Sequence, residues 1–308
     1  MHTALIAILA MALDHLLGEP RRAHPLVGYG RLANAVEARL NRAALPPNAA
    51  RLWGVLAVTA LLAPFVILSA LATHIPVMAT ALEVLLLYLA LGGQSLAQHA
   101  RRVLQGLNAG DLPRARRRVG RMVSRDTDAM QETDVTRATI ESVLENGNDA
   151  VFGTLFWFVL AGVPGAVLYR LANTLDALWG YRTPRYRYFG WAAARFDDLL
   201  NLFPARLTAL TYALLGHYPR ARRCWLTQGC LWESPNAGPV MAAGAGALGV
   251  GLGGPAFYHG ALKQRPTLGT DTLPVAGDIE RAIRLVQQGG ILWLVILLIG
   301  ATGRWWLA

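Results

Sequence analysis

The sequence predicts an all-α, polytopic integral membrane protein, a helical bundle with large cytoplasmic helical loops. Of its 308 residues, 54% are hydrophobic and only 16% are charged, a balance too apolar for an ordinary soluble protein. Residues 53–72 contain no Lys, Arg, Asp or Glu, and about 20 such residues suffice to cross the hydrocarbon core of a bilayer. We therefore predict a single integral membrane domain over residues 1–308.

The amino-terminal stretch from Thr3 to Leu17 is apolar but is interrupted by Asp14 and His15. It has no basic leader and no small-residue cleavage site, which a removable signal peptide would show. We expect an uncleaved helix here.

Further apolar segments follow the span at 53–72. A short turn at residues 74–76, without Lys or Arg, leads into a second apolar helix at 77–91, so the two form a transmembrane hairpin. The last apolar block, residues 289–301, ends in Arg304-Trp305-Trp306. A tryptophan pair in this position is typical of an interfacial anchor.

Charge asymmetry gives the orientation. Residues 101–125 carry eight Arg against one acid, and residues 18–51 carry six Arg against two acids. Basic loops beside apolar spans stay on the cytoplasmic side, so we expect both in the cytoplasm and the protein in the inner membrane. The formal net charge of +10 is accounted for in this way, and no nucleic-acid partner is predicted.

The apolar run at 151–169 raises a topological conflict. A single crossing would place the following basic stretch, residues 182–206, outside the cell, although its arginines are typical of a cytoplasmic loop. Pro164-Gly165 lies in the middle of the run. We therefore predict a broken or re-entrant helix pair near Pro164-Gly165 that returns to the same side.

The alanine and glycine run at 237–252 contains a misleading motif. Residues 244–249 match G-x-G-x-x-G, but no strand precedes them, so close helix packing is the favoured interpretation. A phosphate loop of the Walker type is excluded, because Lys263 does not stand in a Gly-Lys-Ser/Thr sequence.

A polar series precedes the run at 151–169. Arg137, Glu141, Glu145 and Asp149 recur at intervals of four and would share one face of a helix. Ionisable groups at a bilayer boundary are costly without a purpose, and Mg²⁺ prefers oxygen ligands while it binds substrate phosphates. We predict a ligand role for Glu145 or Asp149; a solvated salt-bridge ladder is the alternative.

Other polar clusters have functional and structural interpretations side by side. Residues 126–128 resemble a helix start, for which capping is sufficient explanation. In residues 195–201, Asp197 and Asn201 share a helical face, with Arg195 and Arg206 available for phosphate. Residues 173–176 form a third cluster. Residues 234–236 open a helix, whose free N–H groups suit an anion or are capped by the serine.

These residues resemble the membrane-bound adenosylcobinamide-phosphate synthases of cobalamin biosynthesis, the CobD/CbiB family. The resemblance covers nearly the whole chain in order. The family commonly has Gly-Asp-Pro where this chain has Gly18-Glu19-Pro20, and Asp-Gly where it has Asp149-Ala150. The segments that carry the resemblance are Asp14, residues 18–20, His24-Pro25, 30–32, 125–127, Glu141, Glu145-Asn146, Asp149, 173–176, Gly180-Tyr181, Tyr186, Gly190, Ala194-Arg195, Asp197-Asp198, Asn201, 204–207, 234–236, Gly253-Gly254, Tyr258 and Gly260.

The resemblance implies an ATP-dependent amide ligation that joins adenosylcobyric acid to aminopropanol phosphate or a related amino alcohol, with ATP and Mg²⁺ as cofactors. The chemistry of the candidate residues fits this reaction. A carboxylate reacts with an amine only after ATP converts it into an acyl phosphate or adenylate, while Mg²⁺ screens the phosphates. The amine must be neutral, so one carboxylate is expected to act as general base.

We expect the candidate residues to converge on one pocket at the cytoplasmic face. For His24, a packed loop histidine is the alternative. The candidate catalytic residues are Glu145, Asp149 and Asp197. The candidate metal ligands are Asp126, Glu141, Glu145, Asp149, Asp197 and Asp198. The candidate substrate- or phosphate-binding residues are His24, Arg125, Asn146, Asn173, Asp176, Arg195, Asn201, Arg206, Ser234 and Asn236.

Three other classes stay open at this stage: a Mg-dependent membrane transferase acting on a lipid phosphate, a non-catalytic membrane sensor, and a corrinoid transporter. The transferase class usually pairs two Asp-x-x-Asp motifs, of which this chain shows only looser forms. Expected partners are the two substrates and the lipid bilayer. Self-association and contact with other membrane enzymes of the cobalamin pathway are left open.

Overall fold

The computed structural model describes residues 1–308 except 21–23, 43–44, 74–78, 259 and 308, and only the backbone of 303–307. The predicted turn at 74–76 and the side chains of the predicted tryptophan anchor lie outside these residues. The all-α prediction is confirmed: helices dominate, and the strands are three residues long. Within the described part of the chain, four ranges are long and apolar enough to cross a membrane: Pro47–Ala72, Ala79–Asn108, Glu132–Trp179 and Gly277–Thr302.

The chain forms two compact units, each built from two separated segments. Unit 1 comprises Met1–Gly92 and Gly153–Asn201, and unit 2 comprises Gly93–Phe152 and Leu202–Ala308. The backbone therefore passes from one unit to the other three times.

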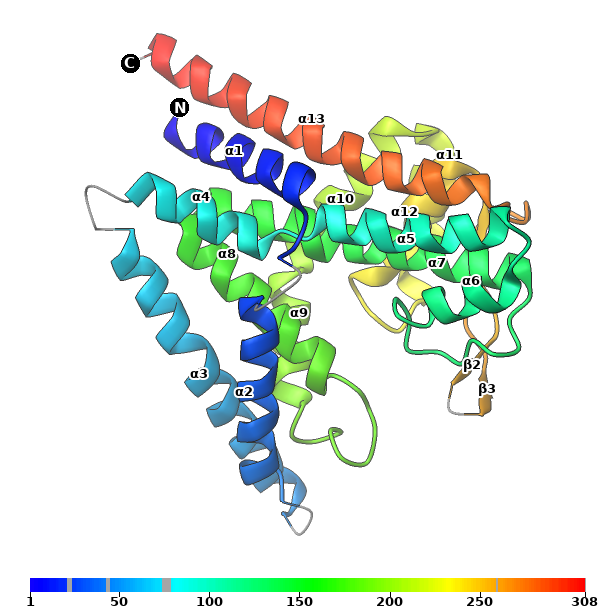
Figure 1. Cartoon of the computed structure of the whole chain (residues 1–308), viewed down its shortest axis with the longest axis horizontal. Coiled ribbons are helices and arrows are strands. Elements are labelled where there is room, and N and C mark those ends of the chain that lie inside the picture. Colours follow the sequence, from blue (N-terminus) through cyan, green and yellow to red (C-terminus); the bar gives the residue numbers. More distant parts are fainter. Residues whose placement is uncertain (21–23, 43–44, 74–78, 259, 308) are drawn as a thin grey trace. The chain divides into compact units, whose positions relative to one another are not determined.

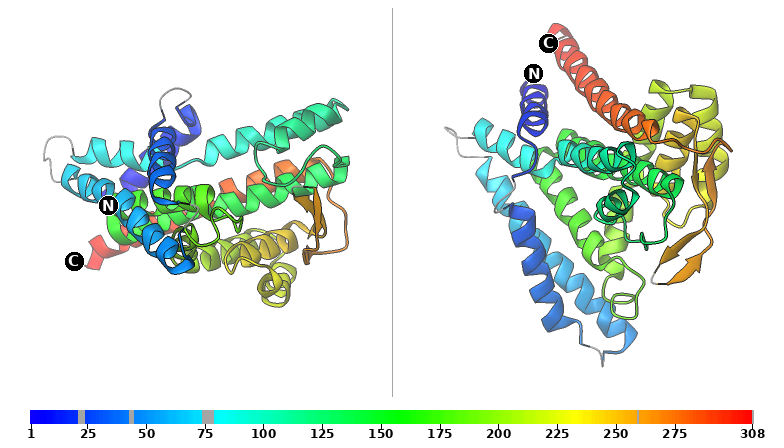
Figure 2. Two further views of the ribbon diagram at one scale, coloured as in Figure 1. Left: turned by 90° about the horizontal axis from the view of Figure 1, so that it is seen from below. Right: turned by 45° about the vertical axis from the view of Figure 1, so that its right-hand side comes forward.

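Unit 1 contains helices joined by loops and turns, and no strand among its described residues. Proline at the start of α2 and of α3 fits the first helical turn, where its missing N–H costs nothing. α2 and α3 pack side by side (Figures 1 and 2), and α8 packs against α2, α3, α4 and α9. The helices are α1 (His2–Leu17), α2 (Pro25–Leu40), α3 (Pro47–Ala72), α4 (Ala79–Ala90), α8 (Gly153–Trp179) and α9 (Trp191–Leu200).

The core of unit 1 lies between α3, α8 and the segment that leads into α9. Trp179 and Phe189 are fully buried, with ring centroids 5.2 Å apart. Gly54 allows α3 to approach this pair closely, because a Cβ at Gly54 would overlap the carbonyl of Phe189.

An ion pair between a buried carboxylate and an exposed arginine fixes the end of α2. The carboxylate of Glu37 is 2% exposed and accepts hydrogen bonds from Arg185 Nε (2.9 Å) and Nη2 (2.6 Å) and from Asn41 Nδ2 (2.7 Å). Burial alone would raise the pKa of Glu37, but these hydrogen bonds outweigh it and the pKa lies below its ordinary value.

α8 is broken, as predicted. Ala161 and Gly162 leave the helical conformation, and Gly162 has φ 64°, a left-handed value that glycine adopts readily. The break precedes Pro164 by two residues, because the proline ring restricts the backbone on its amino-terminal side. Re-entry to the same side of the membrane stays a prediction.

Unit 2 consists of helices and two small antiparallel sheets. β1 pairs with β4, and β2 pairs with β3 in a hairpin that projects from the helices (Figure 1). Its elements are α5 (Gly93–Asn108), α6 (Leu112–Val119), α7 (Glu132–Gly147), the π-helical segment η1 (Asn148–Phe152), α10 (Leu202–Leu215), α11 (Tyr218–Gln228), η2 (Gly229–Leu231), α12 (Ala237–Leu248), β1 (Gly251–Gly253), β2 (Ala256–Tyr258), β3 (Ala261–Lys263), β4 (Thr267–Gly269) and α13 (Gly277–Leu307).

α12 is buried along its whole length. A Cβ at Gly244 would lie 2.6 Å from Leu144 Cδ1, and one at Gly246 would lie 2.7 Å from Ala221 Cα. The glycines of the G-x-G-x-x-G match therefore serve close helix packing, as predicted, and the motif lies within a helix rather than after a strand.

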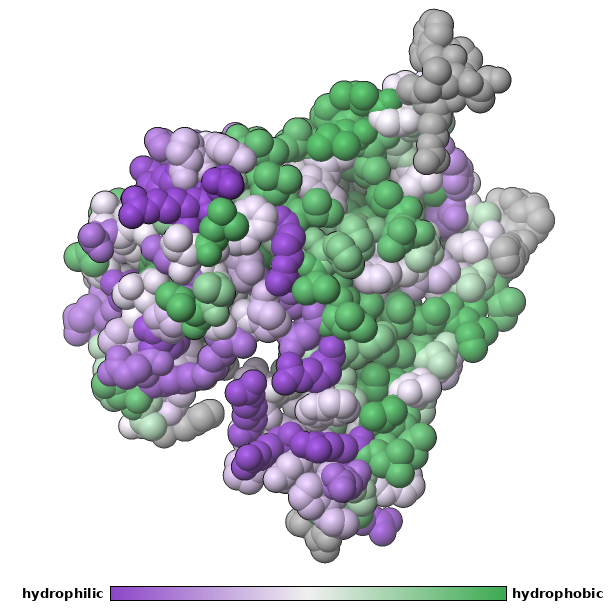
Figure 3. All heavy atoms as spheres, turned by 180° about the vertical axis from the view of Figure 1, so that it is seen from behind, coloured by the Kyte–Doolittle hydropathy of each residue, from purple (hydrophilic) through white to green (hydrophobic). Residues whose placement is uncertain are grey.

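Hydrophobic side chains gather into a broad surface on one face of the molecule (Figure 3). On α3, large apolar side chains are more than half exposed, among them Leu52, Ile67, Leu68 and Leu71. Exposed apolar surface on this scale is typical of a helix that contacts lipid.

The packing at Gly54 gives a stability prediction. Gly54→Ala should lower the free energy of unfolding by about 1–3 kcal/mol, because the added methyl group overpacks the contact with Phe189. Gly28→Ala is the matched control, since its Cβ meets nothing within 4 Å and alanine improves helix propensity by about 1 kcal/mol. Thermal unfolding of the detergent-solubilised variants measures both. Equal unfolding temperatures would contradict the close approach.

Candidate functional site

The helix that carries the predicted carboxylate series starts later than the sequence suggested. The N-cap of α7 is Gln131, which forms a capping box with Asp134, so the prediction of a cap at residues 126–128 is wrong. Asp126 is used differently: its N–H donates to Phe257 O (2.9 Å) and its Oδ2 accepts from Gly260 N (2.7 Å). Asp126 thus holds the β2–β3 hairpin.

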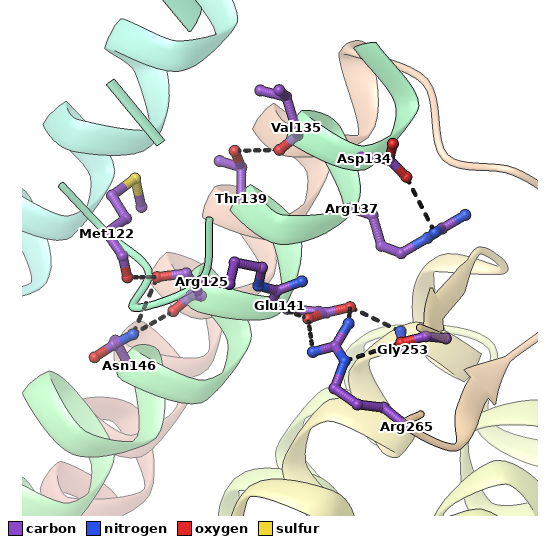
Figure 4. Close-up of polar contacts among 12 residues, drawn as sticks. Met122, Arg125, Asp134, Val135, Arg137, Thr139, Glu141, Asn146, Gly253 and Arg265 are labelled. Carbon is purple, nitrogen blue, oxygen red and sulfur yellow. Dashed lines mark hydrogen bonds and ion pairs between the residues drawn. The ribbon is translucent and has the colours of Figure 1, made fainter. Parts of the chain in front are cut away.

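Glu141 is the centre of a buried ion-pair cluster in unit 2 (Figure 4). Its carboxylate, 2% exposed, pairs with Arg125 and with Arg265 Nη1 (3.0 Å), and Gly253 N donates to Oε1 (2.7 Å). Arg265 also donates from Nε to Gly254 O (2.9 Å). Four segments of unit 2 therefore meet at one carboxylate.

This arrangement corrects the predicted metal role of Glu141 and the predicted phosphate role of Arg125. Two guanidinium groups already surround the carboxylate, so a divalent cation there would face strong repulsion. The Arg125 side chain is only 10% exposed and its charge is engaged. A buried charge needs such partners to be stable, and the cluster is structural.

The shared helical face of the carboxylate series ends at Glu145. Residues 148–152 form a π-helical turn, in which hydrogen bonds run between residues i and i+5. Asp149 therefore leaves the α-helical phase of Glu141 and Glu145. The predicted ladder is also absent at its start, because Arg137 pairs with Asp134 (3.5 Å) rather than with Glu141.

The π-helical turn builds its own polar group. Asn148 donates from Nδ2 to Asp149 Oδ1 (2.9 Å) and accepts at Oδ1 from the hydroxyl of Thr208 (2.9 Å). Tyr212 donates to Leu144 O (3.0 Å) and interacts electrostatically with Asp149. Thr208 and Tyr212 were missed from the sequence, because a hydroxyl in an apolar helix gives no periodic signal.

Asn146 is bound by its own helix. Its Nδ2 donates to Ser142 O (2.8 Å) and Oγ (3.1 Å), as Figure 4 shows. Glu145 is partly buried beside it, and the amide side chain of Asn146 is held against the turn preceding it.

Arg206, Ser234 and Asn236 meet where α12 begins. Arg206 Nη1 donates to Asn236 Oδ1 and to Leu202 O (3.0 Å). Ser234 Oγ accepts from the N–H of Ala237 (3.1 Å). The structure therefore brings these three predicted residues together, and the serine hydroxyl already satisfies a free N–H at the start of α12.

The predicted residues on α8 and α9 form a polar cluster in unit 1. Asp197, 9% exposed, accepts from Asn201 Nδ2 at Oδ2 (3.1 Å) and from Asn173 Nδ2 at Oδ1 (3.4 Å). Tyr169, fully buried, donates to Asn201 Oδ1 (2.8 Å). Asp197 and Asn201 thus share a helical face, as predicted, while Tyr169 was missed.

Arg195 and Asp198 lie at the edge of this cluster and pair at 3.4 Å. Partial burial raises the pKa of Asp198, and Arg195 opposes the shift. Asp176 lies near the end of α8, where its carbonyl accepts from Gly180 N (2.7 Å). His24 caps α2 by accepting from Leu26 N at Nδ1 (3.1 Å).

The six predicted metal ligands are divided between the two units. Among the described residues there is no group of three or more His, Cys, Asp or Glu side chains placed to hold a metal ion. Glu141 and Asp126 serve structural contacts, Asp197 and Asp198 belong to unit 1, and Glu145 and Asp149 belong to unit 2. A resident magnesium cage therefore does not fit. Mg²⁺ that enters with substrate phosphates needs only one or two carboxylates.

The chain matches the family model described as CobD/Cbib protein over residues 7–286. It is 58% identical over 308 residues to a Chromobacterium violaceum protein named Cobalamin biosynthesis protein CobD, covering 98% of this chain and 97% of that protein. A Stutzerimonas stutzeri protein of the same name is 58% identical over 300 residues (97% and 98% covered). A Mycobacterium tuberculosis protein of that name is 39% identical over 307 residues (96% and 95% covered). No solved structure matches the chain significantly.

The buried cluster predicts an unequal response to removal of a carboxylate charge. Glu141→Gln should destabilise the protein by about 3–5 kcal/mol, because two buried guanidinium groups lose their counter-ion. Glu233→Gln removes the same charge from an exposed pair with Lys263 and should cost at most about 1 kcal/mol. Denaturant unfolding in detergent compares the two, and a similar small loss in both would contradict the structural role of Glu141.

Proposed function

The chain belongs to the CobD/CbiB family of cobalamin biosynthesis proteins, and on this basis we propose that it is the amide-forming ligase of that pathway. In the proposed reaction, a propionate carboxyl of adenosylcobyric acid is joined to the amine of aminopropanol phosphate, or of a related amino alcohol. The observation that carries the proposal is the family match over residues 7–286, a range that includes every candidate site residue.

The proposed chemistry has two steps. An oxygen of the corrin propionate attacks a phosphorus atom of ATP, which gives an acyl phosphate with release of ADP or an adenylate with release of pyrophosphate. The neutral amine then attacks the carbonyl carbon, and phosphate or AMP leaves. A general base must take the proton that the amine loses.

Asp197 is the candidate for this base in unit 1. Asn173 and Asn201 each donate to one of its oxygens, and Tyr169 fixes Asn201 in turn. Amide donors orient a carboxylate without adding a formal positive charge, so its basicity is preserved better than beside a guanidinium. The 9% exposure of Asp197 supports a fixed orientation, which proton transfer requires.

Glu145 and Asp149 are the candidates in unit 2, where both carboxylates follow the buried Glu141 cluster. Asn148 holds Asp149 at Oδ1, and Thr208 holds Asn148. A carboxylate supported in this way suits magnesium that arrives with ATP. When bound, Mg²⁺ would screen the phosphate charges against attack by an anionic carboxylate.

The candidate membrane spans and the basic loops support the same function. The four candidate spans support an integral membrane enzyme, and the basic loops predict an inner-membrane location with the chemistry on the cytoplasmic side. Cytoplasmic ATP would be available there.

A direct assay tests the reaction. Purified full-length protein incubated with adenosylcobyric acid, aminopropanol phosphate and Mg-ATP should yield adenosylcobinamide phosphate, detected by mass spectrometry. ADP or AMP among the products would distinguish the two intermediates. No corrinoid product, together with passage of a corrinoid across protein-containing vesicles, would favour a transporter instead.

Substitution of single carboxylates tests the assigned residues. Asp197→Asn should lower kcat by about 100-fold or more, the usual contribution of a general base. The asparagine keeps one oxygen that can accept from Asn201, and Asn173 can turn its amide to accept from the new NH2 group. Glu145→Gln and Asp149→Asn should abolish ligation with membrane insertion intact. Glu233→Gln, exposed and remote in role, is the control and should retain wild-type kcat. Full activity in any of the first three variants would remove that residue from the mechanism.

A further inference from the structure

Two histidines of this chain cap helices in the same way but differ in their surroundings. His24 caps α2 and His217 caps α11, each by accepting a backbone N–H at Nδ1, with a proline in the first turn that follows. His217 is exposed to solvent, whereas His24 is only 9% exposed. Capping alone does not require the far side of the ring to be buried.

The capping hydrogen bond fixes the proton on the other nitrogen of His24. Because Nδ1 accepts from Leu26 N, a neutral His24 carries its proton on Nε2. This Nε2 is buried and has no hydrogen-bond partner among the described residues. Buried donors are almost always satisfied in proteins, so a donor left over in this position suits a bound acceptor.

Arg170 supplies a second buried donor that lacks a hydrogen-bond partner among the described residues. It lies in α8 within the candidate span Glu132–Trp179, and its side chain is 16% exposed. Its Nε is buried without a hydrogen-bond partner in the described part of the chain. Its ion pair with Glu19 is long, at 3.7 Å. A guanidinium inside an apolar helix is costly, and an ion pair as long as the one with Glu19 engages it weakly.

His24, Arg170 and Glu19 belong to one electrostatic group in unit 1. The charges of Glu19 and Arg170 both act on the ring of His24, in opposite directions, while burial is the largest effect and lowers the pKa of His24. A second carboxylate, Asp14, is 8% exposed and acts together with Glu19 on Tyr88, whose hydroxyl donates to Gly18 O (2.6 Å). Donors and carboxylates are therefore close together.

We infer that His24 Nε2 and Arg170 Nε bind the phosphate group of a small phosphate monoester, and that Glu19 and Asp14 lie beside its amine. Tetrahedral phosphate offers several acceptor oxygens, so it can accept from an imidazole and a guanidinium that approach from different directions. The carboxylates suit an ammonium group. The amine half of this ligand rests on the proposed function, whereas the phosphate half rests on the two unsatisfied donors.

Binding without turnover tests the inference. Full-length protein in detergent, without ATP or corrinoid, is titrated with ethanolamine phosphate, inorganic phosphate, ethanolamine and sulfate by isothermal calorimetry. We expect ethanolamine phosphate to bind most tightly. His24→Asn keeps a capping oxygen but withdraws the Nε2 donor, and Arg170→Gln removes the charge; each should weaken binding at least tenfold. His217→Asn makes the same change at the exposed cap and should stay within twofold of wild type.

A spectroscopic readout separates ligand contact from a merely structural role. In histidine-labelled protein, NMR titration should give His24 a pKa below its ordinary value when free, and ethanolamine phosphate should raise it by adding a negative charge beside the ring. The NMR signals of His217 should not change when the ligand is added. If His24→Asn unfolds, Arg170→Lys keeps the charge and loses Nε, and its binding decides the question.

Each outcome bears on the inference. No binding of ethanolamine phosphate or inorganic phosphate by the wild type, or wild-type binding by both the His24 and Arg170 variants, would overturn it. Equal affinity for ethanolamine phosphate and inorganic phosphate would keep the phosphate site and overturn the amine contact. If ethanolamine phosphate binds as expected but no ligation is observed, the proposed function is wrong and this inference stands. If the His24→Asn variant ligates normally, this inference is wrong and the proposed function stands.

Discussion

A carboxylate buried in an apolar helix is stable only while cations and N–H donors surround it, and unit 2 is organised around one such group. Glu141 on α7 forms ion pairs with Arg125 from the preceding loop and with Arg265 from the segment between β3 and β4. It also accepts a hydrogen bond from the backbone N–H of Gly253. The cluster therefore connects the helices of unit 2 to its small sheets, and it accounts for the burial of two arginines beside a candidate membrane span.

The protein uses two kinds of partner for its buried and half-buried acids, and under the proposed function this difference would distinguish structural acids from acids that take part in the reaction. Glu37 and Glu141 are held by guanidinium groups, which neutralise them and fix the fold. Asp197 and Asp149 are held by asparagine amides, which set the direction of the carboxylate oxygens and leave the charge in place. Acids of the second kind suit proton transfer and phosphate-bound magnesium.

Local patterns predicted the helices well and the contacts between distant segments poorly. Hydropathy predicts the span at 53–72, and Pro164-Gly165 predicts the break in α8. Both features could be predicted because each signal is contained in a few neighbouring residues. The pairing of Asp197 with Asn201 follows from a spacing of four. Glu141 shows the limit of such local patterns. The same spacing of four suggested a salt-bridge ladder with Arg137, whereas Glu141 pairs with Arg265, which lies 124 residues away in the sequence. Strands of three residues in a glycine-rich segment are too short for any periodicity to be recognised, and buried phenols such as Tyr169 look like ordinary core residues.

The interleaving of the two units has a consequence for biogenesis. Unit 1 needs the segment Gly153–Asn201, so its first four helices, which pack partly against one another, are synthesised before their partners α8 and α9. Unit 2 in turn must wait for the carboxyl-terminal segment, since Arg265 arrives last at a carboxylate synthesised more than a hundred residues earlier. Neither unit can therefore complete its packing before its second segment has been synthesised. Neither unit is one contiguous stretch of the gene, so a single uninterrupted segment that is copied or moved would not carry a whole unit.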